Sequence, residues 1–298
     1  MNLIQIFMIS AKRSQDSCDK RGKRVAKLTD EEYLRIVRFL KGRYGIDMSR
    51  KKEIVAGRLE NYIRANGWRT YTDYMNAVES DITGNLEKKL VNLLSTNHTF
   101  FMREPEHFTY MKQVVLPWLK QKEARSKDLR IWCGASSTGE EPYTLAMIIM
   151  DYFGLEHGAW DTQVLATDIS TEVLRKAMEG VYTSEQVEVL PENWRRRFFR
   201  KIINEDAYRA TDELKKEVIF RQFNLMDPLP FRKRLHVVFL RNVMIYFDEK
   251  TKKELIEKIY EVMEPGGYLF IGQTETINKE YCPFEHVRPS VYRKREGK

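Results

Sequence analysis

The chain has 298 residues and a mass of 35.5 kDa, with 42% hydrophobic and 12% aromatic residues, which excludes an intrinsically disordered chain. No apolar run approaches the roughly 18 residues that a membrane-spanning helix needs, which excludes an integral membrane protein. Basic residues exceed acidic residues by 51 to 43, and the net charge of +8 suits an acidic partner without identifying it.

Residues 1–27 are expected to form a loose N-terminal extension. The apolar run at 3–9 is followed, not preceded, by basic residues, and no small-residue cleavage site comes after it. A secretory signal has the opposite order. A targeting segment remains the alternative, and the fold is predicted without this stretch.

A small all-helical domain is predicted over residues 28–94. Thr29 begins a capping-box pattern, and apolar residues then recur at helical spacing. Further helices are expected over 50–66, 71–78 and 85–94. In the helix expected over 50–66, Lys51 and Arg58 stand seven residues apart on one edge. That edge is a candidate docking surface for an acidic partner, or an ordinary solvated face.

Residues 95–128 are interpreted as a linker that contributes to an active site. Asn97, Thr99 and Arg103 cluster in the run STNHTFFMRE, with two phenylalanines between them. Such a polar segment threaded with aromatics, just before a sheet, is typical of a segment that closes over a site. The alternative is a plain linker whose aromatics pack on the sheet.

From residue 129 the pattern changes to strands that alternate with helices. Alternation of this kind predicts an α/β domain with a mostly parallel sheet over 129–298. The expected strands are 130–133, 163–167, 236–240 and 268–272, the expected helices are 142–153, 171–178 and 250–263, and 284–292 is a candidate antiparallel strand. The charged, aromatic-rich stretch at about 181–222 interrupts the alternation and is interpreted as an inserted β-subdomain.

Ligands of open parallel sheets bind beyond the carboxyl ends of the strands, so the residues after each strand are the site candidates. Gly134 opens a small-residue turn after the first strand and allows close approach of a ligand. Glu140 and Glu141 follow, where a carboxylate would repel a pyrophosphate and suit a cationic ligand. Neither G-x-G-x-x-G nor G-K-[ST] occurs, which disfavours dinucleotides and nucleoside triphosphates. The alternative is an ordinary acidic helix N-terminus.

Three later strands also end in polar residues. Asp168 follows the second strand, where an acid commonly binds a ribose diol; its alternative is a helix cap. Asn224 and Leu225, and then Arg241 and Asn242, follow later strands. An Asn amide can recognise an adenine edge, although Asn224 is also a common turn residue. The histidines show no metal-ligand spacing, and neither a Ser/His/Asp nor a Cys/His pairing is visible, so no metal is expected.

Five ordered motifs carry a resemblance to a known family. The runs TNHTFFMRE, WCGASSTGEEPYTLA, ATDIS, FNLMDP and LRNVMIYFD resemble the chemotaxis receptor methyltransferases, CheR type, over residues 30–292. The resemblance implies an all-helical domain followed by a Rossmann-like S-adenosylmethionine (SAM) methyltransferase domain with a small inserted β-subdomain. It further implies a cytoplasmic enzyme that esterifies glutamate side chains on the cytoplasmic helices of bacterial chemoreceptors.

The resemblance also implies roles for individual residues. Arg103 and Tyr246 match the pair proposed to hold the substrate, and Glu140 or Glu141 matches an acid near the amino-acid end of the cofactor. The cofactor-binding residues that it implies are Asn97, Thr99, Arg103, Gly134, Glu140, Glu141, Asp168, Asn224, Leu225, Arg241 and Asn242.

The resemblance breaks down in one loop. The corresponding loop of enteric members contains glycine and docks a receptor tether peptide, whereas 201–208 is shorter here and has no glycine. We therefore expect an enzyme that does not depend on a tether.

Two other interpretations of the sequence compete with a receptor methyltransferase. The net charge and the run 242–246 would suit a nucleic-acid methyltransferase, but the prolines of that motif are absent. A catalytically silent scaffold that binds receptors would not need Arg103, Asp168 and Tyr246. The absence of a catalytic His or Cys is consistent with an enzyme, because a glutamate carboxylate with a pKa near about 4.3 is already ionised at pH 7.

Overall fold

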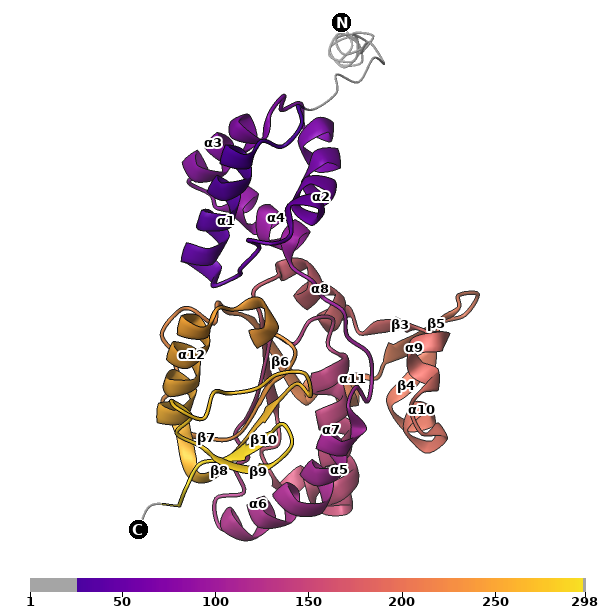
Figure 1. Ribbon diagram of the computed structural model, residues 1–298. Helices are drawn as coiled ribbons and strands as arrows, with labels where there is room; N and C mark the ends of the chain where they lie inside the picture. The colour runs from indigo at the N-terminus through magenta and orange to yellow at the C-terminus, as the bar shows by residue number, and fades with distance from the viewer. Residues whose placement is uncertain (1–25, 297–298) are drawn as a thin grey trace, which may run out of the picture.

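The computed structural model describes residues 26–296 (Figure 1). Residues 1–25, which make up nearly all of the predicted N-terminal extension, lie outside this part, as do Gly297 and Lys298. Within residues 26–296, no helix combines the length and the apolar character that crossing a bilayer would require.

Four helices form the N-terminal unit, at the top of Figure 1: α1 (Asp30–Tyr44), α2 (Lys52–Ala65), α3 (Tyr71–Ser80) and α4 (Asn85–Leu94). Thr29 caps α1, since its side chain accepts from the Glu32 N–H while the Glu32 carboxylate accepts from the Thr29 N–H. Gly45 ends α1 in the left-handed region, at φ 69°. The apolar faces of the four helices bury one another in a core of their own.

A seven-stranded sheet of order β6-β2-β1-β7-β8-β10-β9 is the centre of the larger unit. Its strands are β1 (Ile131–Gly134), β2 (Val164–Asp168), β6 (Val218–Gln222), β7 (Leu235–Leu240), β8 (Met263–Ile271), β9 (Glu285–Arg288) and β10 (Val291–Arg293). The first five of these pair in parallel, and β10 runs antiparallel to both of its neighbours. The predicted α/β fold with a mostly parallel sheet is therefore confirmed.

Helices cover both faces of this sheet (Figure 1). Along β1, Ile131 and Cys133 pack toward α7 (Glu140–Phe153), whereas Trp132 packs toward α12 (Glu249–Val262). The first of these faces is also covered by α5 (Pro105–Tyr110), the π-helical turn η1 (Met111–Val115) and α6 (Leu116–Lys122), whose apolar side chains are buried in the same core. Residues 105–122 thus form part of the covering layer, which their prediction as a linker missed.

The inserted subdomain holds a separate three-stranded sheet of order β3-β5-β4, which projects to the right in Figure 1. Its elements are β3 (Val181–Thr183), α9 (Ser184–Glu188), α10 (Glu192–Phe198), β4 (Phe199–Lys201) and β5 (Ala207–Ala210). The chain then returns through α11 (Asp212–Lys216), and β6 pairs with β2 in the main sheet. The insertion is therefore shorter than the expected 181–222. β6 lies at the edge of the sheet and pairs only with β2. Charged residues flank it in the sequence, so no apolar pattern distinguishes it as a strand of the main sheet.

Short elements complete the chain: η2 (Gly154–Ala159), α8 (Thr171–Glu179) and the 3-10 turn η3 (Met244–Tyr246).

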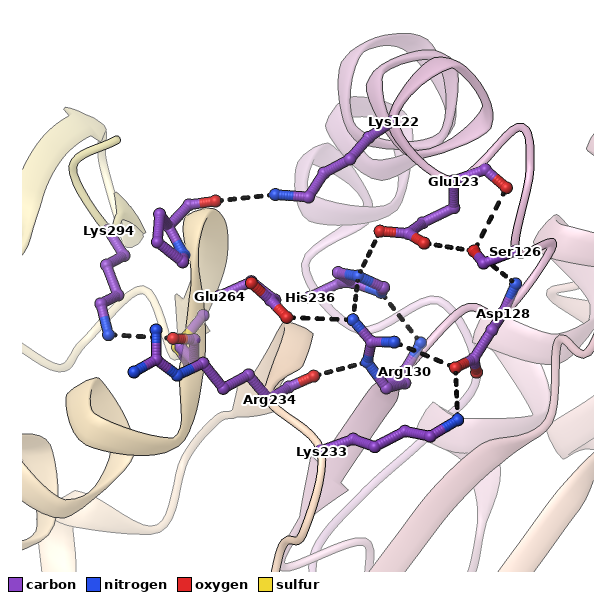
Figure 2. Close-up of polar contacts among 12 residues, drawn as sticks. Lys122, Glu123, Ser126, Asp128, Arg130, Lys233, Arg234, His236, Glu264 and Lys294 are labelled. Atoms are coloured by element: carbon purple, nitrogen blue, oxygen red, sulfur yellow. Dashed lines mark hydrogen bonds and ion pairs between the residues drawn. The ribbon is translucent and has the colours of Figure 1, made fainter. Parts of the chain in front are cut away.

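The amino ends of the parallel strands are joined by a polar network (Figure 2). At its centre Arg130 pairs with Asp128 at 3.0 Å and with Glu264 at 3.2 Å. His236 accepts from the backbone N–H of Arg130 and lies 3.0 Å from Glu123, and burial lowers the pKa of this histidine to about 4. This network joins β1, β7, β8 and the end of α6 at the edge opposite the carboxyl ends.

Candidate active site

A cavity lies between the helical unit and the carboxyl ends of the parallel strands. Ten of the twelve predicted site residues line it: Asn97, Thr99, Arg103, Glu141, Asp168, Asn224, Leu225, Arg241, Asn242 and Tyr246. Five segments that are far apart in the sequence therefore meet there. The meeting follows from the parallel order of β6, β2, β1 and β7, which directs all their carboxyl ends to one edge.

Asp168, at the end of β2, is held by backbone N–H groups from the loops after β1 and β2. Its Oδ2 accepts from the Ser137 N–H and its Oδ1 from the Ser170 N–H, both at 2.9 Å. Burial raises the pKa of Asp168, although these backbone N–H groups counteract part of the rise. Ser137 and Ala135 both take positive φ, at 49° and 56°, which bends the loop after β1 across the cavity. Each carboxylate oxygen keeps acceptor capacity for a ligand.

Arg241 forms a buried charge cluster with two glutamates. One amino group of its guanidinium lies 2.5 Å from Glu141 and the other 3.0 Å from Glu104, and the Arg241 side chain is fully buried. Burial alone would raise the pKa of Glu104, but Arg241, together with hydrogen bonds from the Asn242 side chain and the Gln273 N–H, lowers it below its usual value. One cation and two carboxylates leave a net negative charge, and Nε of Arg241 has no partner among the described residues.

Glu140 and Gly134 do not line the cavity, although both are predicted cofactor ligands. Glu140 is turned inward, where its carboxylate accepts from the Thr138 hydroxyl at 2.7 Å and the Gln186 amide at 3.2 Å, and burial raises its pKa. A side chain at Gly134 would meet Leu240 at 3.0 Å and Trp132 at 3.2 Å. Of the two adjacent acids, the geometry therefore favours Glu141 as the one that faces a ligand.

Arg103 and Tyr246, the predicted substrate pair, both line the cavity, Arg103 from the segment before α5 and Tyr246 from η3. The Arg103 guanidinium donates to the His98 carbonyl at 2.9 Å and lies 5.8 Å from the centre of the Phe100 ring. Because a guanidinium has five N–H groups, donors remain for a carboxylate. The carbonyl of Tyr246 accepts from the Asp47 N–H at 2.8 Å, so the loop after α1 holds this residue in place.

Asn224 and Asn97 already have partners. The Asn224 amide donates to the Arg43 carbonyl at 2.9 Å, and its oxygen accepts from the Met226 N–H at 3.1 Å, as in a turn. The Asn97 carbonyl accepts from the Ser137 hydroxyl at 2.9 Å, which ties the segment before α5 to the loop after β1. Asn224 therefore makes the contacts of a turn residue, as the alternative interpretation expected, and it also lines the cavity.

The sequence interpretation missed two kinds of residue. Tyr44, Ile46 and Met48 bring the helical unit into the cavity wall, and no local pattern indicates which helix ends face it. Glu104 and Glu275 support the wall from behind, and each accepts a hydrogen bond from Asn242. Such residues are identified by hydrogen bonds to partners that are distant in the sequence, and only the fold brings these partners together.

The expectation for Lys51 and Arg58 needs a correction. Arg58 donates to the Leu94 and Ser95 carbonyls, both at 2.9 Å, and so completes the end of α4. The Lys51 ammonium lies 4.9 Å from the centre of the Tyr246 ring. Arg58 therefore stabilises the helical unit and is not free for docking, whereas Lys51 lies beside Tyr246, which lines the cavity.

The parallel sheet with a single antiparallel strand near its edge, and acids at the ends of its strands, defines a Rossmann-like SAM-dependent methyltransferase. Family comparison makes this specific. Residues 97–293 match the CheR methyltransferase SAM-binding domain, and residues 31–95 match the CheR methyltransferase all-alpha domain. The chain belongs to the CheR methyltransferase family, which confirms the resemblance of its motifs.

Curated relatives cover nearly the whole chain. The chain is 36% identical to a chemotaxis protein methyltransferase of Borreliella burgdorferi, over 90% of this chain and 95% of the relative. It is 34% identical to the chemotaxis protein methyltransferase of Escherichia coli, over 84% and 86% respectively. A third relative, from Salmonella typhimurium, is 32% identical over 89% of this chain and 90% of the relative.

Proposed function

We propose that the protein transfers a methyl group from SAM to glutamate side chains of bacterial chemoreceptors and forms glutamate methyl esters. The observation that carries the proposal is that Arg103 and Tyr246 line the same cavity as Glu141 and Asp168. Donors for an acceptor carboxylate and acids for a cationic cofactor therefore border a single space.

The charges of the cavity suit SAM. With their carboxylates ionised, Glu141 and Asp168 in the wall and Glu104 behind it outnumber the cations Arg103 and Arg241 by one. SAM carries an ammonium, a sulfonium and a carboxylate, a net charge of +1, and supplies an electrophilic methyl group when bound. Asp168 would hold the ribose hydroxyls, and Glu141 the amino-acid end. Asn97, Thr99, Leu225, Arg241 and Asn242 would complete the cofactor wall, with Asn224 toward the adenine.

No general base is required for the transfer. An ionised glutamate carboxylate would be the nucleophile: its oxygen would form the new C–O bond as the methyl carbon–sulfur bond breaks, and S-adenosylhomocysteine would leave as a neutral thioether. Aligning these atoms can contribute about 7–11 kcal/mol at most. Arg103 would aim the carboxylate with its forked donors, and the neutral Tyr246 hydroxyl would add a weaker one. A stronger grip would stabilise the ground state, because both reacting charges disappear during transfer.

We further propose that receptor binding does not depend on a tether peptide. The loop between β4 and β5 is short and contains no glycine, unlike the loop that the resemblance implies for enteric members. Receptors that lack their C-terminal residues should accept methyl groups as fast as intact receptors. A loss of rate upon that truncation would show that the inserted subdomain docks a peptide after all.

Methyl-labelled SAM tests the proposed reaction directly. Base-labile label on receptor membranes is the expected product, and label in RNA offered in parallel would refute the proposal. Arg103→Ala should cut turnover far more than SAM affinity, and Tyr246→Phe should cause a partial loss, since only one positioned donor is removed. If Arg103→Ala abolishes SAM binding but leaves turnover at saturating SAM intact, Arg103 is a cofactor ligand only.

A further inference from the structure

Glu275 is a buried carboxylate next to the candidate site, and none of the roles above uses it. It follows β8 by four residues, and 6% of its surface is exposed. Its pKa is raised by burial, and the groups that counteract the rise are backbone N–H groups, not cations. Burying a carboxylate without a cation costs free energy of folding unless hydrogen bonds compensate for the lost water.

Its hydrogen bonds converge on one loop. Oε2 of Glu275 accepts from the Asn242 N–H at 2.8 Å and the Gly272 N–H at 2.6 Å, and Oε1 accepts from the Ile245 N–H at 3.2 Å. Asn242 and Ile245 belong to the turn after β7, in which both Asn242 and Tyr246 line the cavity. We define residues 242–246 as the acceptor loop.

The acceptor loop begins in the left-handed region and lies close against the end of β8. Asn242 takes a positive φ of 58°, which is uncommon for a residue other than glycine. Gly272 lies directly against it: a side chain there would collide with the Asn242 amide nitrogen and meet the Asn242 backbone nitrogen at 2.9 Å. The ends of β7 and β8 thus approach as closely as a glycine permits, and the Glu275 carboxylate joins them.

We infer that Glu275 is a positioning residue for methyl transfer: it holds the acceptor loop so that Tyr246 presents its hydroxyl to the acceptor carboxylate. This inference rests on the proposed function of Tyr246. A carboxylate suits the task because both of its oxygens only accept hydrogen bonds. Glutamine at this position would have the same shape, but its NH₂ group would face a backbone N–H donor.

Two variants disturb this contact in different ways. Glu275→Gln keeps the size of the side chain and removes half of its acceptor capacity. Gly272→Ala keeps Glu275 and presses on Asn242. The matched control is Glu280→Gln, the same chemical change at an exposed position of the same segment. Thermal melting of all three full-length variants confirms that each is folded before kinetics are measured.

The first measurement is amide hydrogen exchange of the acceptor loop. The Asn242 and Ile245 amides should exchange at least about tenfold faster in Glu275→Gln and in Gly272→Ala, and at the wild-type rate in Glu280→Gln. This readout does not depend on the reaction. Unchanged exchange in the first two variants would overturn the inference at the level of structure.

The second measurement is kcat at saturating SAM and receptor. Glu275→Gln should lower kcat between about tenfold and a hundredfold, as for a reacting group displaced by an ångström. If Glu275 acts through Tyr246, the Glu275→Gln, Tyr246→Phe double variant should be no slower than the slower single variant. Losses that multiply, or a wild-type kcat despite faster exchange, would overturn the inference. If Tyr246→Phe alone keeps full kcat, the proposed role of Tyr246 fails, and the inference fails with it although the exchange result stands.

Discussion

Replacing Asp168 with asparagine should weaken SAM binding. Each carboxylate oxygen already accepts one backbone N–H, from Ser137 or Ser170, so its remaining acceptor capacity is what a ribose diol would use. Asparagine keeps one acceptor oxygen and places an NH₂ group at the other position. That group cannot accept from a ribose hydroxyl, and it also faces a backbone N–H donor.

The size of the effect follows from these contacts. A hydrogen bond to a charged group contributes about 1.5–3 kcal/mol. Losing one such bond should raise the Kd for SAM between about tenfold and a hundred-and-fifty-fold, since 1.4 kcal/mol corresponds to a factor of ten. Asp168→Ala should weaken binding at least as much, because it removes both oxygens and leaves two backbone N–H groups without their acceptor.

Isothermal titration calorimetry of SAM binding measures the change in Kd. The matched control is Asp161→Asn, which makes the same substitution at an exposed position near the opposite end of β2. Its Kd should stay at the wild-type value. A wild-type Kd in Asp168→Asn would refute the reasoning and remove Asp168 from the cofactor site. If the control weakens binding equally, the effect is a general one of charge.

Glu141→Gln should raise the Kd for SAM about fivefold or more, whereas Glu140→Gln should change it less than about twofold, and calorimetry would give the reverse order if Glu140 were the ligand. Arg58→Glu should lower the unfolding free energy by about 1–3 kcal/mol in urea titrations because two helix-end carbonyls lose their donor, and an unchanged value would return Arg58 to the surface. Lys51→Glu should instead raise the receptor KM at low salt, with a loss that shrinks as salt screens the wild type; a salt-independent loss would contradict a steering role. His236 takes up a proton below about pH 6.5 when unfolded but only near about 4 when folded. The unfolded state therefore binds more protons in this window, and stability should fall by about 2 kcal/mol from this group between pH 7 and pH 5, an effect that His236→Gln should lack.

The fold class and the family could be predicted from the sequence because their signals are local. Alternating apolar strands and amphipathic helices specify a parallel sheet wherever they occur in this order. A parallel sheet in turn places the residues after each strand at one edge, which is why the sequence alone indicates Asp168, Arg241 and Asn242 as candidates. The five ordered motifs add the family, which the match to its two domains confirms.

Other parts could not be predicted because they depend on which surfaces meet. The β6 strand has too many charged neighbours to look like part of a sheet, and only its pairing with β2 reveals it. Residues 105–122 look like a connection, but their apolar side chains cover one face of the sheet. In the same way, Arg58 looks like a free surface cation until α4 is placed beside α2.

The choice between Glu140 and Glu141 shows the limit most clearly. The two residues are adjacent and identical, so composition and spacing treat them alike. Helix α7 turns successive side chains by about 100°, and packing of its apolar face against the sheet decides which acid points where. Glu140 turns toward Gln186 and the inserted subdomain, and Glu141 toward Arg241 and the cavity. The sequence by itself determined that this helix begins with acids after a strand; only the tertiary structure decided which of them faces the cavity, because helix rotation is set by contacts with distant segments.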